Sequence, residues 1–587
     1  MIIDSVHLHA VFFCGDLLNI KGKYLTSACI LLFSSIIVKF ISAVYKIPLS
    51  AYIGAVGRGY YTFAYNLIMP VHAVTMGAFP VALSKLVSKY NSLGNIKMVH
   101  SLKKCSIRLF GFVGLFSMIF LLLFAKPYSD FIVKSPDTVY TAVVLAPSVL
   151  FSCMAASYRG YFEGNINMLP TAVSQIIEAL FKMVFGILFA KFSVSALLNQ
   201  YNQTSTVLGI AASDYDSAFA LIYPFSSAAS MLGVTLGSLV SLCYLWAYSV
   251  FKTNKSEKVD NYNASYVRRL LILQSYPIMI STCVQSIFQF LDTASIQYAL
   301  NNTSYYEIKR FFSHSLSYVS VLEKDLPTFA CGIHSAALDF KNIVPGITMA
   351  LGVSAVPVIS SLYETKNTQK LKVISDSIYK YTFMLSSVGG LILYFCCDNM
   401  LNILYRTSSP DIAQGALDIT KYYALTVPCF SLAGISVFSV QALGKAEKSI
   451  PSYIVCGIIR VVLNVFLIQN TSLLLYGVVI SSAIGYTVML LWNVIIYKKY
   501  AKIKLSFLKT FALPILAEIV SFVITNVLLD NINYYNNEFV LIILKTFIVT
   551  LTYCFLCFLC GLLNFKRFFR YLTHKNIPQT LANKGKM

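Results

Sequence analysis

Charged side chains inside apolar stretches are the residues of this chain with the clearest capacity for chemistry. Ionised groups are costly in hydrocarbon, so each one suggests a functional role. Lys39 is the strongest candidate, because it is too deep to snorkel easily and has no carboxylate within one helical turn. Compact positive charge and guanidinium forks bind phosphate well. Lys39, Lys46, Arg58 and Arg460 therefore predict a cationic chamber suited to a phosphate or pyrophosphate group.

Acidic residues in apolar stretches are fewer. Glu178 and Lys182 lie four residues apart, so they could neutralise each other on one helix face and act as a packing device as readily as a site. Asp292 closes another stretch, and with Glu178 it is a candidate for coupling to a proton or a sodium ion. Three lysines near the expected outer ends of their stretches are predicted to snorkel to the interface: Lys341, Lys421 and Lys545.

Enzyme signatures are missing from the sequence. It contains neither G-x-x-x-x-G-K-[ST] nor H-E-x-x-H, so we expect no ATP hydrolysis, no metal and no cofactor. Cys554, Cys557 and Cys560 have metal-like spacing, but they lie in an apolar run and are interpreted as small hydrophobes. The glycine-rich stretch 54–59 predicts a tight turn between helices.

The composition indicates an all-α polytopic membrane protein. Of 587 residues, 57% are hydrophobic and only 12% are charged, with a mean hydropathy of +0.69. Apolar runs of about 20 residues are long enough to cross a bilayer as helices. We predict fourteen spans, at 24–45, 61–84, 109–125, 139–158, 170–190, 225–249, 270–292, 337–362, 381–397, 418–442, 452–469, 473–496, 510–529 and 540–563.

The basic residues alternate between the gaps. Most of the 46 Lys and Arg residues fall in every second gap between the spans, which places those gaps and both termini in the cytoplasm. The net charge of +22 is thus explained by short loops that meet anionic membrane lipids, and nucleic-acid binding is not expected. The facing loops 191–224 and 293–336 are predicted to be outside, and the segment 301–327 is interpreted as an insertion in the second of them.

An internal repeat divides the predicted spans. The residues 80–84 (PVALS) are matched by 357–361 (PVISS), and Gly164 with Pro170 is matched by Gly444 with Pro451, each about 280 residues later. Six spans followed by six in the same orientation imply a parallel repeat and a cavity between two lobes. The predicted domains are a cytoplasmic segment 1–23, lobes 24–250 and 270–496 joined by a cytoplasmic linker 251–269, two additional helices 497–563, and a basic cytoplasmic tail 564–587.

The stretch 158–164 (YRGYFEG), followed by Met168, 170–175 (PTAVSQ) and Glu178, closely resembles a signature of a known family. It is similar to the stage V sporulation protein B and polysaccharide biosynthesis family, relatives of the MurJ-type lipid II flippases in the MOP (MATE-like) exporter superfamily. Two departures from the family are the long polar segment 301–327 and the residues 331–332 (CG) with 339–341 (DFK), which replace a more apolar, proline-containing run of the eighth helix.

The resemblance implies alternating access and export of an undecaprenyl-linked precursor, lipid II or a related oligosaccharide pyrophosphate, across a bacterial cytoplasmic membrane. It implies that Lys39 and Arg58 line the cavity and that the two extra helices accommodate the lipid tail. It marks Arg159, Glu163, Gln175 and Glu178 as gate or signature residues that could equally be structural. The setting, sporulation or general wall synthesis, stays open.

Two rival functions stay open. One is an ion-coupled multidrug or metabolite antiporter of the same superfamily, which an acid-lined pocket would favour. The other is a membrane glycosyltransferase or polymerase, which would need paired carboxylates in a large outer loop. Asp214, Asp216, Glu307 and Glu323 lie in such loops, but no donor-binding motif accompanies them.

Overall fold

The computed structural model describes residues 22–252, 262–470, 472–529 and 537–562. These residues form an almost entirely helical protein, which confirms the predicted fold class. The elements are α2 Gly22–His72, η1 Ala73–Ala78, α3 Phe79–Ser92, α4 Ile96–Pro127, η2 Tyr128–Ile132, α5 Thr138–Gly164, α6 Leu169–Thr204, β1 Thr206–Val207, β2 Ile210–Ala211, α7 Tyr215–Lys252, α8 Ala264–Asn301, α9 Tyr305–Phe311, η3 Glu323–Asp325, α10 Leu326–Lys341, α11 Ile343–Glu364, α12 Thr368–Tyr405, α13 Pro410–Ala442, η4 Ala446–Ser449, α14 Ile450–Asn470, α15 Leu475–Ala501, η5 Leu508–Ala512, α16 Leu513–Leu529 and α17 Glu538–Leu559.

Twelve helices in the described part of the chain are long and apolar enough to cross a membrane, and α8, bent by 50°, makes a thirteenth. The helical run Phe33–Ser92 counts as one of the twelve, although most of the predicted first span and all of the second fall within it. The structural count is therefore lower than the predicted fourteen. The tail and nearly all of the N-terminal segment fall outside the described residues, and so does the middle of the linker, residues 253–261.

Lipid-facing surfaces follow helical periodicity. On α4, Phe112, Phe116 and Phe120 are 70%, 65% and 48% exposed, and on α17 Ile543 and Phe547 are similarly exposed. Large apolar side chains spaced four residues apart form one continuous stripe on a helix. Such stripes on long apolar helices are the surface that a bilayer covers, so this is a multi-pass membrane protein.

The chain divides into two compact units. The first comprises Met1–Asp339, Leu404–Ile419 and Ala446–Met489, and the second comprises Phe340–Ile403, Thr420–Lys445 and Leu490–Met587. The division of the sequence into two six-helix lobes at the predicted boundaries stays a prediction.

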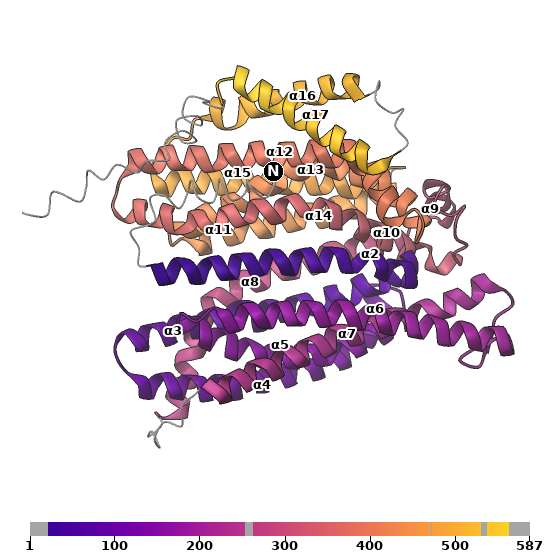
Figure 1. The fold of residues 1–587 in the computed structure, drawn as a ribbon, viewed down its shortest axis with the longest axis horizontal. Helices are drawn as coiled ribbons and strands as arrows, with labels where there is room; N and C mark the ends of the chain where they lie inside the picture. The colour runs from indigo at the N-terminus through magenta and orange to yellow at the C-terminus, as the bar shows by residue number, and fades with distance from the viewer. Residues whose placement is uncertain (1–21, 253–261, 471, 530–536, 563–587) are drawn as a thin grey trace, which may run out of the picture. The chain divides into compact units, whose positions relative to one another are not determined.

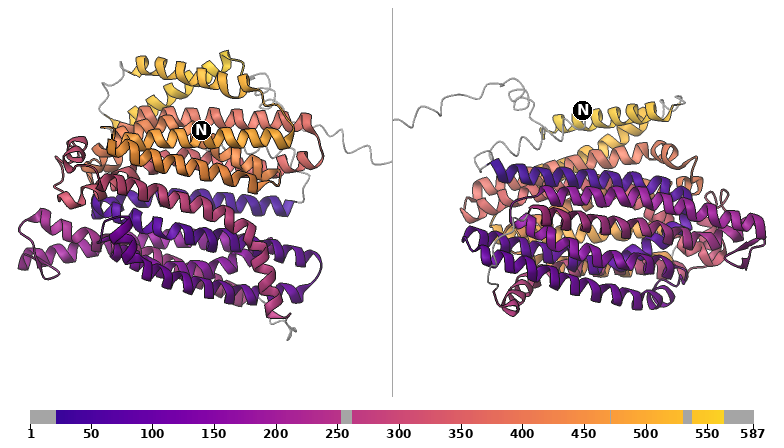
Figure 2. Two further views of the ribbon diagram at one scale, coloured as in Figure 1. Left: turned by 180° about the vertical axis from the view of Figure 1, so that it is seen from behind. Right: turned by 60° about the horizontal axis from the view of Figure 1, so that its bottom comes forward.

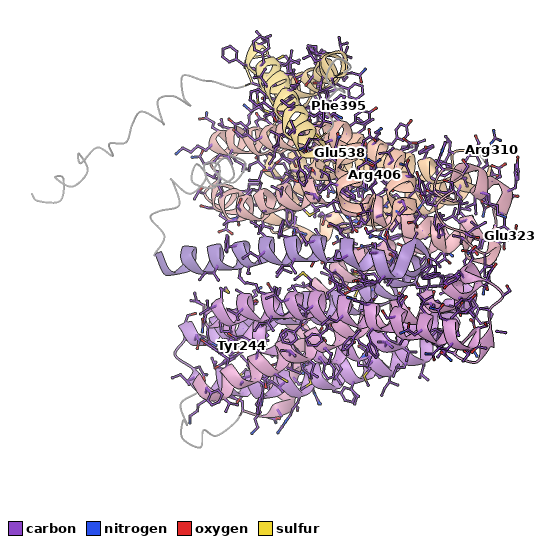
Figure 3. The ribbon with its side chains drawn as sticks, turned by 45° about the vertical axis from the view of Figure 1, so that its right-hand side comes forward. Tyr244, Arg310, Glu323, Phe395, Arg406 and Glu538 are labelled. Carbon is purple, nitrogen blue, oxygen red and sulfur yellow. The ribbon has the colours of Figure 1, made fainter. Side chains whose placement is uncertain are left out.

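In the first unit, α6 and α7 run side by side and are joined at one end by the two-stranded hairpin β1–β2, in which Thr206 pairs with Ala211 (Figures 1 and 2). Tyr244, near the other end of α7, lies at the opposite end of this unit from Arg310 and Glu323 (Figure 3). The segment that contains Arg310 and Glu323 therefore lies at the end of the unit away from Tyr244. In the second unit, α16 and α17 pack with α12 through an apolar cluster that includes Leu391, Ala517 and Val549.

Candidate functional site

Two cations of the predicted chamber share one carboxylate. Arg58 NH2 and Lys46 Nζ both bind Asp339, Lys46 at 2.5 Å from Oδ1 and Arg58 at Oδ2. The side chains of Arg58, Asp339 and Lys46 are 5%, 22% and 33% exposed. We call these three residues the Asp339 cluster. One carboxylate for two cations leaves a positive charge in excess, and Lys46 is the cation that solvent reaches.

Arg58 is held by its whole guanidinium group. Its Nε donates to Ser335 Oγ at 2.9 Å and its NH1 donates to Ser50 Oγ at 2.7 Å and to Tyr405 OH at 3.5 Å. With NH2 on Asp339, every nitrogen of the fork has an acceptor. A fixed fork is the geometry that suits Arg for planar anion recognition, and lysine could not reproduce it.

A break in α2 sets the position of Arg58. At Gly54 the backbone takes φ 61° and ψ −176°, a left-handed conformation that favours glycine because it has no Cβ. The chain then continues as helix toward His72. The predicted turn at 54–59 is therefore a single-residue break, and it lets Lys46 before it and Arg58 after it reach the same aspartate.

The other partner helix, α10, approaches α2 unusually closely. A Cβ on Gly332 would lie 1.8 Å from the carbonyl oxygen of Ala55, so only glycine fits. Ser335 and Asp339 follow Gly332 at spacings of three and seven residues, which is the same helix face. The close crossing therefore directs Ser335 and Asp339 at Arg58.

Lys39 lies on α2 and is exposed. It precedes Lys46 by seven residues, which is almost two full turns, so both lysines share a helix face about 10 Å apart along the axis. The structure thus aligns Lys39 with the Asp339 cluster along one side of α2.

The fourth predicted cation belongs to another cluster. Arg460 NH2 lies 2.5 Å from Asp292 Oδ2, with side chains 16% and 11% exposed. Asn464 donates to Asp292 Oδ1 at 3.0 Å and Tyr486 OH accepts from Arg460 NH1 at 3.2 Å. We call Asp292, Arg460, Asn464 and Tyr486 the Asp292 cluster. Arg460 therefore forms an ion pair with Asp292, the residue predicted to couple transport to an ion.

The signature residue Arg159 joins three helices. From α5 it donates to Ser174 Oγ at 3.0 Å and Glu178 Oε2 at 2.7 Å on α6, and to Ser241 Oγ at 2.9 Å on α7. Glu178 therefore forms its ion pair with Arg159 of the neighbouring helix. Lys182 instead lies over tyrosine rings, 4.7 Å from the ring centroid of Tyr65.

The remaining signature residues lie nearby. Glu163 is half-buried in the last turn of α5, and Gln175 is half-buried on α6 between Ser174 and Glu178. The gate assignment of all four stays a prediction. Next to them, a Cβ on Gly160 would lie 2.7 Å from the carbonyl oxygen of Pro80, so this part of the signature is also a close-packing motif.

Two lysines predicted to snorkel are buried in the second unit. Lys341 is 2% exposed, with its Nζ 4.5 Å from the ring centroid of Tyr423. Lys545 is 8% exposed and donates to Asn399 Oδ1 at 2.8 Å. The prediction is wrong for both, because polar and aromatic partners from neighbouring helices hold them inside the protein.

Asp339 is a site residue that the sequence does not single out. Its signal in the sequence is a carboxylate two residues before Lys341, at the start of a predicted apolar span and in a part that departs from the family. Among the described residues, no group of three or more His, Cys, Asp or Glu side chains could hold a metal ion.

Comparisons with known proteins agree with this architecture. The polysaccharide biosynthesis protein family matches residues 24–215 and the MatE family matches residues 314–466. The lipid II flippase MurJ of Bacillus subtilis (strain 168) is 24% identical over 499 residues, which are 82% of this chain and 84% of that protein. The stage V sporulation protein B of the same organism is 21% identical over 497 residues, 84% and 87% of the two chains.

Solved structures show the same fold. An inward-closed structure of the lipid II flippase MurJ matches with a TM-score of 0.61 and 14% identity, covering 91% of this chain and 98% of that one. An inward-facing multidrug resistance MATE transporter of the MOP superfamily matches with a TM-score of 0.58 and 14% identity, covering 80% and 99%.

The fold is therefore the one shared by the lipid II flippase MurJ and the MATE transporters. Two family models each match part of the chain, and the chain is a distant homologue of the lipid II flippase MurJ and of the stage V sporulation protein B.

Proposed function

We propose that this transporter moves an undecaprenyl-linked cell-wall or polysaccharide precursor, lipid II or a related lipid-linked oligosaccharide, across the cytoplasmic membrane. The observation that carries the proposal is the excess positive charge of the Asp339 cluster. Lys39 adds a further positive charge on the same face of α2, two turns before Lys46. A diphosphate headgroup needs compact positive charge and a guanidinium fork in a site of low dielectric. Lys39 and Lys46 supply the compact charge, on the helix that the resemblance implies lines the cavity. The fork of Arg58 is occupied by protein acceptors and keeps Asp339 paired.

The arrangement suggests an order of contacts. With both termini in the cytoplasm, Lys39 lies nearer the cytoplasmic side and the Asp339 cluster nearer the outer side. A headgroup entering from the cytoplasm would meet Lys39 first and then Lys46, displacing Asp339 as the partner of Lys46. Arg58 would hold Asp339 throughout, so the carboxylate remains paired while Lys46 changes partner.

We expect transport to be driven by a source of free energy other than nucleotide hydrolysis. A membrane potential, inside negative, favours outward movement of a negative headgroup by about 2.3 kcal/mol per charge per 100 mV. An ion gradient or consumption of the product outside are the other sources. The lipid tail would stay in the bilayer, alongside the additional helices α16 and α17.

The alternative function, an ion-coupled antiporter, has less support. A cation-coupled antiporter needs a carboxylate that a transported cation can reach. Asp292, the predicted coupling residue, already has a guanidinium at 2.5 Å and an amide at 3.0 Å.

The test is headgroup exposure in cells depleted of their own lipid II flippase. Cells would express the natural chain, Lys39→Ala, or Lys191→Ala as a matched control, since Lys191 is an exposed lysine of α6. We expect lipid II to become accessible to an externally added cleaving toxin with the natural chain and the control, and much less with Lys39→Ala. If lipid II becomes accessible with all three chains, the proposed function stands, but Lys39 is not part of the binding site. No exposure with the natural chain, at normal membrane levels, would contradict lipid II as the substrate.

A further inference from the structure

A cavity of about 270 Å³ lies in the first unit where the polar segment after α8 meets the starts of α13 and α15. The residues that matter to its chemistry are Phe311, His314, Gln414, Gly415, Asp418 and Tyr476. Ligand pockets for drug-sized molecules are usually larger, about 300–1,000 Å³. This one has room for a single small ring.

The aromatic wall of the cavity is firmly supported. The Phe311 ring lies 4.9 Å from the Tyr476 ring at 58°, and Phe312 packs edge-on against Phe329 of α10 at 5.6 Å. Phe312 is 3% exposed and Phe329 is fully buried. Aromatic side chains held in this way present a fixed apolar face to a ligand.

The floor of the cavity is equally constrained. Ser315 Oγ donates to the carbonyl oxygen of Asp411 at 2.9 Å, which ties the segment after α9 to the first turn of α13. A Cβ on Gly415 would lie 2.6 Å from Ser315 Oγ. The cavity is therefore preformed by tertiary packing and does not depend on a ligand to shape it.

The polar side chains of the cavity indicate which class of ligand it can bind. Tyr476 OH donates to Asp418 Oδ2 at 3.4 Å, and Gln414, Asp418 and His314 are exposed at the rim. No lysine or arginine is among the residues that line it, so it lacks the charge to bind a phosphate. A carboxylate and an amide accept and donate hydrogen bonds in fixed directions beside an apolar ring face.

We propose that this cavity, which we call the Asp418 pocket, binds one sugar ring of a saccharide. The C–H face of a pyranose would pack on the rings of Phe311 and Tyr476, while Asp418 and Gln414 would bind its hydroxyl or acetamido groups. The pocket lies in a loop region predicted to be outside. Resting on the proposed function, we infer that it receives the sugar of the transported headgroup on the exit side, separate from the cationic site for the diphosphate.

This assignment gives a role to the inserted segment 301–327. Figure 3 shows Arg310 and Glu323 at the end of the unit away from Tyr244. The hydrogen bond of Tyr60 to Asp325 at 3.3 Å ties the segment to α2, and the ion pair of Lys309 with Glu323 at 2.7 Å holds two parts of the segment together. Without the segment, the pocket would lose Phe311, His314 and Ser315.

The test measures binding to the purified full chain in detergent. The probes are soluble N-acetylglucosamine, glucose and inorganic pyrophosphate, and their binding is detected by saturation-transfer NMR. The variants are Asp418→Asn and Gln414→Ala, with Tyr306→Ala as a matched control, because Tyr306 is 72% exposed and does not line the pocket. We expect one of the sugars to bind the natural chain and the control alike, and Asp418→Asn to weaken binding about tenfold, as expected for loss of one charge-assisted hydrogen bond. Pyrophosphate should not compete.

Absence of sugar binding, equal binding by Asp418→Asn, or competition by pyrophosphate would each overturn the proposal. Lipid-linked saccharide in nanodiscs should displace the free sugar, and failure to displace it would overturn the assignment to the headgroup. The same variants in the exposure assay separate the two proposals. Sugar binding without headgroup exposure would contradict the proposed function and the assignment to the headgroup, and would leave the sugar site itself. Exposure without sugar binding would contradict the Asp418 pocket alone.

Discussion

The Asp339 cluster and the Asp292 cluster each pair arginine with one aspartate, but they differ in the balance of charge. In the Asp339 cluster two cations share one carboxylate, and one of them, Lys46, is 33% exposed. In the Asp292 cluster one arginine meets one carboxylate, with side chains 16% and 11% exposed, and neutral polar groups complete the network. The first keeps a net positive charge within reach of a ligand, whereas the second is neutral and closed.

The difference indicates a division of roles. A closed, neutral ion pair holds helices in register, and its net contribution can be replaced by well-packed apolar side chains. An open cluster with unbalanced charge has no such substitute if its purpose is to meet an anion. The Asp292 cluster should therefore tolerate replacement by apolar side chains, and the Asp339 cluster should not.

The largest effect is expected from opening the closed pair. Asp292→Ala leaves the Arg460 charge inside the protein without its carboxylate, which should cost about 3–5 kcal/mol of stability. Thermal unfolding of the detergent-purified chain would measure it. The double variant Asp292→Leu, Arg460→Met should recover most of the loss and also transport. If the double variant folds normally but does not transport, Asp292 is a coupling residue and the comparison fails.

Arg58→Lys keeps the charge of the open cluster but removes the fork. It loses the bonds from Nε to Ser335 and from NH1 to Ser50. Both hydroxyls keep their bonds to carbonyls of their own helices, so each lost bond should cost about 0.5–1.5 kcal/mol. We expect headgroup exposure to fall at least tenfold while the protein still reaches the membrane. Normal exposure with Arg58→Lys would show that charge alone suffices and that the fork is not needed.

Gly332→Ala tests the crossing that builds the open cluster. Its Cβ would collide with the carbonyl of Ala55, so α2 and α10 must separate, at a cost of about 1–3 kcal/mol. The matched control is Gly111→Ala on α4, where the new Cβ has only a contact at 4.0 Å. Thermal unfolding should distinguish the two variants. Equal stability would contradict the view that this crossing positions Asp339.

The smallest effect on stability, and the sharpest on function, is expected from Lys46→Gln. Because Lys46 is partly exposed, removing its charge should change stability by less than about 1 kcal/mol. Headgroup exposure should nevertheless fall. The control is Lys309→Gln, which also removes an exposed ion-paired lysine. Unchanged exposure with Lys46→Gln would remove this residue from the binding site.

Much of the fold could be predicted because apolar runs of helical length report membrane spans directly. The cations Lys39, Lys46 and Arg58 could also be selected, since intramembrane charge is conspicuous in a sequence. The pairing with Asp339 could not, because it joins residues 281 positions apart through a glycine contact that has no local pattern. Lys341 was misjudged for the same reason, since its aromatic partners lie on another helix.

The most direct test of the central claim is transport by the purified chain in vesicles. A lipid-linked saccharide diphosphate would be placed in the vesicles, and its headgroup on the opposite leaflet would be scored with a cleaving enzyme that cannot cross the membrane. The account predicts movement by the natural chain and by Lys309→Gln, little movement by Lys46→Gln or Arg58→Lys, and no movement of a lipid with a neutral headgroup. Equal movement of the neutral lipid, or full movement by Lys46→Gln and Arg58→Lys, would contradict it.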